Sequence, residues 1–148
     1  MTENRTLQFY LDPQAKAKGA KFQAPRLGDA GFDLLASEDL AMAPGAQVLV
    51  STGLKLAIPV GWVGIIKDRS SVSLKRIYTH AGVIDASYRG EVKVVLSNHS
   101  TESYHISAGQ KFAQMIVVPY LAEAIEVSKA EMLGDTNRGQ GGFGSTGK

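Results

Sequence analysis

The feature that most constrains the fold is a succession of short runs of β-branched and aromatic residues, from about Thr6 to Val127, with almost no helical periodicity. Gly, Pro, Asn and Asp separate the runs, as turns separate strands. The clearest strands are expected at 47–50, 54–58, 62–67, 91–97 and 112–120, with turns at 43–45 and 59–61. Many short strands of this kind predict an all-β fold, a barrel or a sandwich.

The one helical candidate lies between Ser71 and Arg76, with Ser70 or Ser71 as its N-cap. It is too short to organise the fold. The 148 residues have the length of one ordinary domain, and neither a fixed-period repeat nor a linker divides them. We therefore expect one β domain with one short helix.

Composition and charge exclude several classes of function. Without cysteine, the chain has neither a disulfide framework nor a thiolate zinc site. Its start lacks the pattern of a secretory signal, and no run approaches the roughly 18 apolar residues of a membrane span. A formal charge of +2 with scattered Lys and Arg argues against a nucleic-acid surface. These features predict a soluble, cytoplasmic protein with no nucleic-acid or membrane partner, and any anion it binds should be small.

Two loops carry groups that bind ions. Asp29 and Asp33 flank a glycine just before an apolar pair, so Asp33 is expected at the start of a strand. Carboxylates in such places are usually solvated or bound to turn amides. The sequence DRSS at 68–71 offers a guanidinium and two hydroxyls before the helical turn, a set suited to an anion. Taken alone, that tetrapeptide is more simply interpreted as an N-cap with a surface ion pair.

The stretch GVIDASYRG at 82–90 places Asp85 directly behind an apolar pair, with Tyr88 three residues later and glycines at both ends. A carboxylate between apolar neighbours costs free energy unless it is paired or used. We therefore expect Asp85 to be functional.

Gln114 is the polar residue of an expected buried strand. A buried amide must find partners, so Gln114 either ties down backbone or orients a water or a phosphate. Histidines 80, 99 and 105 lack metal-ligand spacing. Because there is also no Cys and no HxE motif, a zinc deaminase site of the cytidine type is excluded.

The C-terminal residues 139–148 hold five of the 16 glycines, with Phe143 among them. Ordering such a segment costs roughly 1 kcal/mol or more per residue, so we expect an arm and not a core element. A disordered tail is one interpretation of this composition. Against it stand the ligand-binding groups of Arg138, Phe143, Ser145, Thr146 and Lys148. GFGSTGK at 142–148 fits the first seven positions of a P-loop, but no hydroxyl residue or helix follows it. A P-loop fold is rejected, although a glycine backbone can still wrap a phosphate.

Taken in order, five segments resemble the motifs of the trimeric dUTPase family: DAGFD (29–33), DRSSVSLK (68–75), GVIDASYRG (82–90), GQKFAQ (109–114) and RGQGGFGSTG (138–147). The resemblance implies a jelly-roll-like β-barrel over residues 1–134 and a flexible arm over 135–148 that closes a neighbouring active site. The implied reaction is hydrolysis of dUTP to dUMP and pyrophosphate by water attack on the α-phosphorus. That reaction limits uracil incorporation into DNA and supplies dUMP for thymidylate synthesis.

The resemblance also implies roles for single residues. Asp85 would activate the attacking water and meet the sugar 3'-hydroxyl, and Gln114 would lie near the attacked phosphorus. Tyr88 would pack on the deoxyribose and exclude UTP. The backbone from about Thr79 to Val83 would pair with the uracil edge. Cytosine presents the opposite donor and acceptor pattern, and the backbone groups that it leaves unpaired can support roughly 10⁴-fold rejection of the cytosine nucleotide.

The remaining implied contacts concern the triphosphate, the base and the metal. The implied substrate-binding residues are Arg69, Ser70, Ser71, Thr79, Val83, Tyr88, Lys93, Arg138, Phe143, Gly144, Ser145 and Thr146. Among them, Arg138 would meet the γ-phosphate and Phe143 would stack on uracil, a contact worth about 1 to 3 kcal/mol. Mg²⁺ would accompany the triphosphate, with Asp33 acting through water. The sites would lie between the subunits of a homotrimer.

Three positions depart from the pattern of the family. Ser71 stands where glycine is usual, Asp68 replaces a small residue or proline, and Gln140 replaces Ser or Thr. Ser71 and Asp68 could crowd or repel a phosphate, but none of the three removes a group that the reaction requires.

Two other functions stay open. One is dCTP deamination on the same fold, which uses a glutamate where this chain has Val95. The other is a non-enzymatic, nucleotide-gated interaction module, against which the intact acid, glutamine and arm argue.

Overall fold

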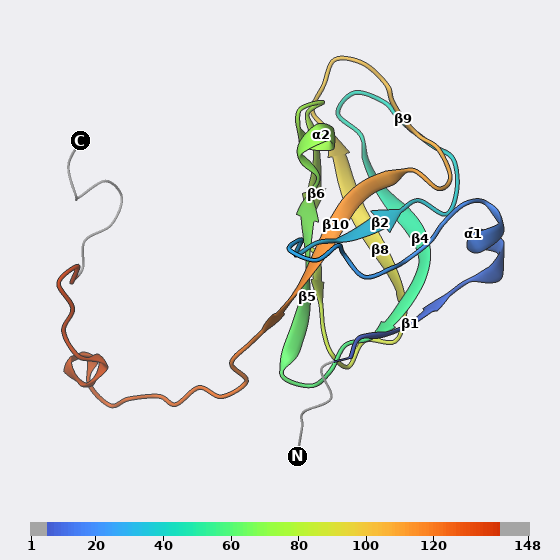
Figure 1. Ribbon diagram of the computed structural model, residues 1–148. Coiled ribbons are helices and arrows are strands. Elements are labelled where there is room, and N and C mark those ends of the chain that lie inside the picture. Colours follow the sequence, from blue (N-terminus) through green and yellow to red (C-terminus); the bar gives the residue numbers. More distant parts are fainter. Residues whose placement is uncertain (1–5, 140–148) are drawn as a thin grey trace.

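The computed structural model describes residues 6–139, and these are mostly β-structure (Figure 1). The strands are β1 (Gln8–Leu11), β2 (Phe32–Leu35), β3 (Leu40–Met42), β4 (Gln47–Ala57), β5 (Trp62–Asp68), β6 (Ile77–His80), β7 (Val83–Ile84), β8 (Glu91–Asn98), β9 (Tyr104–Ile106) and β10 (Lys111–Pro119). The helices are α1 (Pro13–Ala17), α2 (Ser70–Ser73) and a 3-10 helix, η1 (Ala130–Leu133).

The strands form two four-stranded sheets and one two-stranded sheet. The four-stranded sheets have the orders β1-β4-β8-β6 and β2-β10-β5-β7, and β3 pairs with β9. Every pairing is antiparallel. The expected β-class is confirmed. Within residues 6–139 the ladder hydrogen bonds do not close a barrel, so the jelly-roll-like barrel and the division at residue 134 stay predictions.

The core lies between the two large sheets. Its largest fully buried side chains are Phe112, Leu34, Met42, Leu54, Ile77, Leu96, Ile106 and Met115. In β4 the residues at alternate positions from Val50 to Leu56 are buried, as the two-residue period of a strand requires. The buried hydroxyl of Thr52 in this series donates to the carbonyl of Val92 at 2.6 Å.

β4 corrects the prediction of two separate strands at 47–50 and 54–58. It is one strand whose register with β8 shifts between Ser51 and Lys55. Gly53 lies inside the shift with a φ of 68°, a conformation that glycine adopts without a Cβ penalty. The glycine therefore marks an irregularity within a strand and not a turn between two strands.

The helices differ from the prediction of one helix at 71–76. α2 begins at Ser70 and ends at Ser73, and its N-cap is Arg69, with no side-chain cap hydrogen bond. The predicted serine cap is wrong because the chain enters the helix directly from β5, leaving Arg69 in the extended cap position. The unpredicted α1 has a side-chain cap, since Asp12 accepts from the N–H groups of Gln14 and Ala15. No helix within residues 6–139 is long and apolar enough to cross a membrane.

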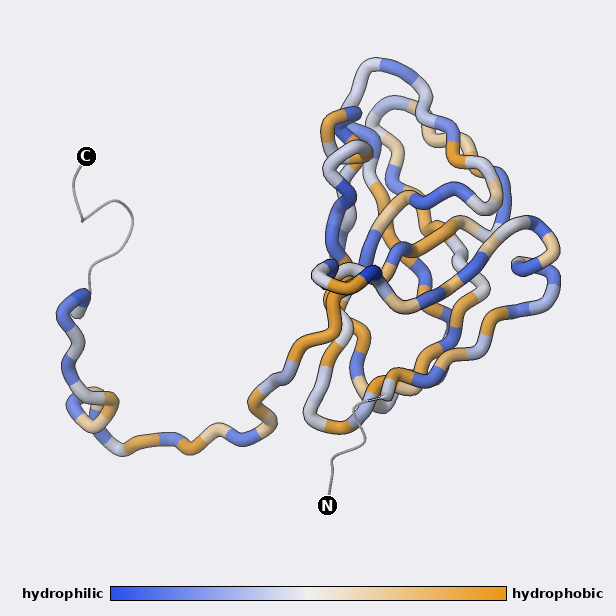
Figure 2. The backbone as a smooth tube through the Cα atoms, viewed as in Figure 1, coloured by the Kyte–Doolittle hydropathy of each residue, from blue (hydrophilic) through white to orange (hydrophobic). Residues whose placement is uncertain are grey.

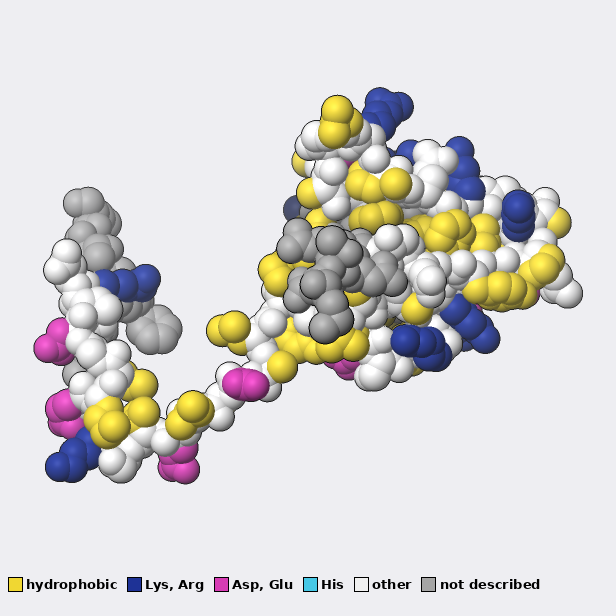
Figure 3. Space-filling view, turned by 60° about the horizontal axis from the view of Figure 1, so that its bottom comes forward, with side chains coloured by type: hydrophobic (Ala, Val, Ile, Leu, Met, Phe, Trp, Pro, Cys, Tyr) yellow, Lys and Arg dark blue, Asp and Glu magenta, His cyan; other side chains and the backbone are white. Residues whose placement is uncertain are grey.

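After β10, residues 120–139 run away from the sheets (Figure 1). Apolar and polar residues alternate along this segment (Figure 2), and apolar side chains are exposed on it (Figure 3). Leu121 is 96% exposed, Ile125 89% and Leu133 77%. Within residues 6–139 this apolar surface has no cover, which is the usual mark of a surface that another chain buries.

Candidate active site

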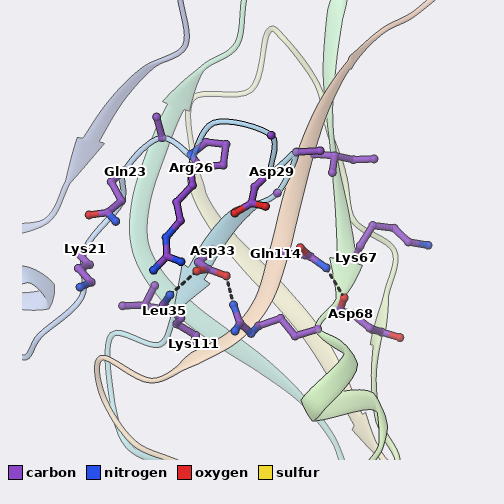
Figure 4. Close-up of a pocket in the computed structure, with 17 residues that line it drawn as sticks. Lys21, Gln23, Arg26, Asp29, Asp33, Leu35, Lys67, Asp68, Lys111 and Gln114 are labelled. Carbon is purple, nitrogen blue, oxygen red and sulfur yellow. Dashed lines mark hydrogen bonds and ion pairs between the residues drawn. The ribbon is translucent and has the colours of Figure 1, made fainter.

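A pocket of about 760 Å³ lies where β2, β5 and β10 meet the loop before β2. We call it the charged pocket. Its charged and amide side chains are Lys21, Gln23, Arg26, Asp29, Asp33, Lys67, Asp68, Arg69, Lys111 and Gln114 (Figure 4). Cations outnumber carboxylates by five to three in this lining. The pocket is therefore suited to a small polyanion.

Asp33 lies at the centre of the charged pocket (Figure 4). It is the second residue of β2, as expected of a strand start. Its Oδ1 pairs with Nη1 of Arg69, and its Oδ2 lies 2.6 Å from Nζ of Lys111. One carboxylate thus holds a guanidinium from the end of β5 and an ammonium from β10 in place, each available to a ligand on its other side.

Gln114 lies between Asp33 and Lys67 in the sheet register. It is half-buried, and its Nε2 donates to the backbone carbonyl of Asp68 at 2.8 Å. The expectation that this amide has a partner is confirmed. A Cβ at Gly31 would overlap Oε1 of Gln114, so the glycine of DAGFD makes room for this side chain.

Ser70 and Ser71 follow Arg69 as the first two residues of α2. Both are exposed at the surface. Because neither caps the helix, the interpretation of DRSS as a simple N-cap is wrong, and the two hydroxyls stand beside the guanidinium of Arg69.

The consecutive strands β6 and β7 pair with β8 and β5 and not with each other. They carry Thr79 and Val83, with Asp85 just after β7, and we call this segment the hairpin. Its turn contains Ala81 and Gly82, with φ values of 57° and 99°. A Cβ at Gly82 would stand 2.7 Å from Cβ of Ile66, so the turn lies directly on β5. The backbone N–H of Ile66 also donates to the carbonyl of Gly82 at 2.8 Å.

Asp85 is exposed, although the neighbouring Ile84 is buried. The expectation that apolar neighbours desolvate this carboxylate is therefore wrong for a single chain. Nothing among residues 6–139 covers Asp85, so its desolvation requires a contact from outside this part of the chain.

Asp85 lines a pocket of about 590 Å³ together with Leu49, Val83, Ile84, Tyr88, Glu91 and Lys93. We call it the hairpin pocket. The Tyr88 hydroxyl donates to the carbonyl of Glu91 at 2.9 Å, which fixes the ring. Nζ of Lys93 lies 3.5 Å from Oε2 of Glu91. The pocket thus combines two carboxylates, an aromatic ring and a cation.

Asp85 also lines an apolar hollow of about 710 Å³. Its apolar lining residues are Val60, Val63, Ile65, Val83, Ala86 and Tyr120. Val60 is 91% exposed and Val83 64%. An apolar surface of this kind beside a candidate functional acid fits contact with another protein chain.

The predicted site residues form two groups that lie apart in one chain. The charged pocket and the hairpin pocket share no lining residue. Gly64 of β5 pairs with Ile84 of β7 in antiparallel register. One residue further in the same register, Asp85 lies beside Val63. Arg69 lies six residues farther along the chain, about 20 Å away at roughly 3.3 Å per residue. Asp85 and Arg69 of one chain cannot act on the same phosphorus.

The predicted arm residues are described only in part. Arg138 lies in the exposed segment after β10. Phe143, Gly144, Ser145 and Thr146, like the departure at Gln140, lie outside the described residues.

Sequence reasoning missed four basic residues of the charged pocket, namely Lys21, Arg26, Lys67 and Lys111. Lys67 directly precedes DRSSVSLK and Lys111 lies within GQKFAQ, and their alternation with buried neighbours could have indicated a shared face. Lys21 and Arg26 belong to the loop before DAGFD, which has no local pattern that points to a site.

The histidines do not form a metal site. The Nε2 atoms of His80 and His99 lie 2.6 and 2.8 Å from Oγ of Ser97, and His105 is exposed on β9. In the described part of the chain no group of three His, Cys, Asp or Glu residues is placed to hold a metal ion.

The chain is similar to known proteins over nearly all of its length. Residues 18–147 match the family model described as dUTPase. A deoxyuridine 5'-triphosphate nucleotidohydrolase of Picosynechococcus sp. is 44% identical over 123 residues, which cover 81% of this chain and 85% of that protein. The corresponding protein of Candida albicans is 40% identical over 152 residues, covering 100% of this chain and 92% of the relative.

The chain is also similar to solved structures of dUTPases. The dUTPase of Staphylococcus bacteriophage 80alpha, in a mutant form with dUpNHpp, has a TM-score of 0.86 at 26% identity, covering 98% of this chain and 100% of that one. A mutant dUTPase from phage phi11 of S. aureus, described for its coordination of a structural Mg(II) ion, has a TM-score of 0.76 at 25% identity, covering 85% and 99%.

Proposed function

This chain belongs to the dUTPase family and hydrolyses dUTP to dUMP and pyrophosphate, and we propose that its active sites lie between the subunits of a homotrimer. The observation that carries this proposal is the separation of Asp85 from Arg69 and Gln114. These residues line different pockets of one chain, although water attack on a phosphorus needs them at one place. The hairpin pocket of one chain therefore faces the charged pocket of another.

Two apolar surfaces support contact between chains. The hollow beside Asp85 is lined mainly by apolar side chains, and Leu121, Ile125 and Leu133 are almost fully exposed on the segment after β10. Burying these surfaces in an assembly stabilises it by roughly 25 cal/mol per Å² of apolar area. The same contact desolvates Asp85, which a general base of this kind requires.

Asp85 is the proposed general base. Its carboxylate takes a proton from the water that attacks the α-phosphorus, and it also accepts from the sugar 3'-hydroxyl. Tyr88 packs on the deoxyribose and leaves no room for a 2'-hydroxyl. The backbone from Thr79 to Val83 pairs with uracil, and Lys93 lines the hairpin pocket together with Val83 and Asp85. Cytosine leaves those backbone groups unpaired and is rejected.

The charged pocket is proposed to hold the triphosphate. Arg69 and the hydroxyls of Ser70 and Ser71 bind phosphate oxygens, and the carboxylate of Asp33 orients the guanidinium. Gln114 orients the attacked phosphorus and its water, a role that suits an amide fixed on the carbonyl of Asp68. Lys111 adds a second cation on the far side of Asp33.

Mg²⁺ is proposed to enter with the triphosphate, whose charge it neutralises when it is bound. Mg²⁺ usually keeps several waters and takes one or two carboxylates plus substrate phosphates. The donor set fits this mode, since Asp33 is the carboxylate at the centre of the pocket. Both of its oxygens contact cations, which favours a contact with the metal through water.

The C-terminal residues 135–148 are proposed to act as an arm that closes a site on a neighbouring chain. Arg138, Ser145 and Thr146 would bind the γ-phosphate, Phe143 would stack on uracil, and Gly144 would let the backbone approach the nucleotide. Residues 1–134 would form the jelly-roll-like barrel that carries the arm.

Subunit mixing tests the shared site. Asp85→Asn and Arg69→Ala chains, differently tagged, are refolded together in equal amounts, and activity is compared with that of each variant alone. If Asp85 and Arg69 of one site come from different chains, a mixed assembly contains sites with both native residues. On random mixing half of the hairpins carry Asp85 and half of the charged pockets carry Arg69, so about a quarter of wild-type activity should return. Mixtures as inactive as the single variants, or a particle of one chain by light scattering, would contradict the proposal.

A further inference from the structure

Asp68, the last residue of β5, contacts two different parts of the molecule. Its Oδ1 accepts from the backbone N–H and from the hydroxyl of Thr79, both at 2.7 Å. Its backbone carbonyl accepts from Nε2 of Gln114. In Figure 4 its carboxylate points away from Asp33 and Lys111. The carboxylate that could repel a phosphate is thus turned toward Thr79.

The bond from Asp68 to Thr79 joins the two large sheets. β5 belongs to the sheet β2-β10-β5-β7, whereas β6, which carries Thr79, belongs to the sheet β1-β4-β8-β6. The β6–β7 hairpin therefore has its first strand in one sheet and its second strand in the other. The distance between β6 and β7 therefore depends on how the two sheets are held together at this point.

β6 pairs with β8 along its whole length, but local structure holds β7 and the turn before it weakly. β7 has only two residues, Val83 and Ile84, paired with β5, and the turn uses left-handed residues at positions 81 and 82. A charge-assisted hydrogen bond is about twice as strong as a neutral one. Two such bonds to Thr79, in a half-buried place, are a substantial part of what fixes β6 against β5.

We propose that Asp68 is a positioning residue for substrate recognition, which fixes the base-reading hairpin through Thr79 and the triphosphate loop through its own backbone. This inference rests on the proposed function of the hairpin and the charged pocket. In an assembly with shared sites, each site takes a loop from one chain and a hairpin from another. Loss of Asp68 then weakens the contacts to the base and to the triphosphate of every bound dUTP.

The test compares Asp68→Ala with Asp68→Asn, whose amide oxygen can still accept from Thr79. We expect Asp68→Ala to raise KM for dUTP by about tenfold or more, with a smaller change in kcat, and to lower the preference for dUTP over dCTP. Asp68→Asn should have a clearly smaller effect than Asp68→Ala, because the acceptor is retained although its charge is lost. Equal effects of the two variants would overturn the role assigned to this acceptor.

Thr79→Val provides a second test that leaves Asp68 in place. It removes the hydroxyl and keeps the backbone N–H, so we expect the same changes in KM and in base preference, but smaller. If Asp68→Ala fails to fold, this variant carries the test, and an unchanged KM and preference would overturn the proposal. In a folded double variant the effects should be less than additive.

Amide exchange at Thr79 tests the contact without any turnover. Protection of this N–H should fall in Asp68→Ala and persist in Asp68→Asn, and unchanged protection in Asp68→Ala would overturn the proposal. Turnover of dUTP by the wild type tests the proposed function separately. Asp39→Ala is the matched control, because Asp39 also accepts a distant backbone N–H, that of Ala108 at 2.8 Å, but lies outside both pockets.

Discussion

Gly31 packs directly against the side chain of Gln114, so that a Cβ atom at position 31 would overlap Oε1 of the amide. Gln114 is the flexible partner, and Gly31 lacks the left-handed φ that would strain an alanine. Gly31→Ala should therefore move Gln114 and leave the fold intact. We expect kcat to fall by about tenfold to a hundredfold, since a displacement near 1 Å can cost that much, with little change in Tm.

The cause of that loss can be checked with a double variant. If Gly31→Ala acts through Gln114, adding it to Gln114→Ala should change kcat little further. Independent, multiplying effects would contradict the displacement of the amide.

Asp85→Asn should separate catalysis from binding. The substitution keeps the shape of the side chain but removes the base, and general-base assistance contributes about 10²- to 10⁴-fold. We expect kcat, measured by pyrophosphate release, to fall by at least that range, while the affinity for dUpNHpp stays near that of the wild type. Near-normal turnover would remove Asp85 from the role.

Gly90 stands against the ring of Tyr88, and a Cβ at this position would overlap the phenol. Gly90→Ala should therefore displace the ring and break its hydrogen bond to the carbonyl of Glu91. We expect a higher KM for dUTP and weaker discrimination against UTP, measured as the ratio of kcat/KM values. Tyr88→Phe, which keeps the ring and loses only the hydroxyl, is the control and should retain most of the discrimination.

The four longest strands, β4, β5, β8 and β10, could be predicted because their signal is local, whereas the short strands were not named. Alternation in β4 and the apolar runs of β5, β8 and β10 identify strands without reference to the rest of the chain. The continuity of β4 through Gly53 could not be predicted, because glycine marks turns as often as irregular strands. α1 is only five residues long, which is too short to show a helical period. Its cap at Asp12 and its proline were therefore not recognised as the start of a helix.

The site residues could be predicted individually, but their arrangement could not. Asp33, Asp85 and Gln114 are conspicuous because each breaks an apolar pattern. Their division between two pockets depends on sheet order, which no local pattern contains. The hydrogen bonds of the Asp68 carboxylate to Thr79 also depend on the arrangement of the sheets. Because the sequence does not show this contact, it predicted that Asp68 would repel a phosphate.

Deletion of the chain from Arg138 onward tests the arm. Arg138 follows η1 and all the strands of residues 6–139, so we expect a folded assembly with the Tm of the full chain. Pyrophosphate release from dUTP should fall to a small fraction of wild type, because the γ-phosphate and the uracil face lose their contacts. An unfolded or monomeric product would instead make the arm structural.

Removal of divalent metal should affect turnover and not the fold. Among residues 6–139 no group of three His, Cys, Asp or Glu residues could hold a metal, and both oxygens of Asp33 already contact Arg69 and Lys111. EDTA should therefore lower kcat for dUTP and leave the Tm of the nucleotide-free protein unchanged. The increase in Tm caused by dUpNHpp should shrink without Mg²⁺, as expected when a ligand binds the native state more weakly. A fall in Tm on adding EDTA to the nucleotide-free protein would instead indicate a metal held by the protein itself.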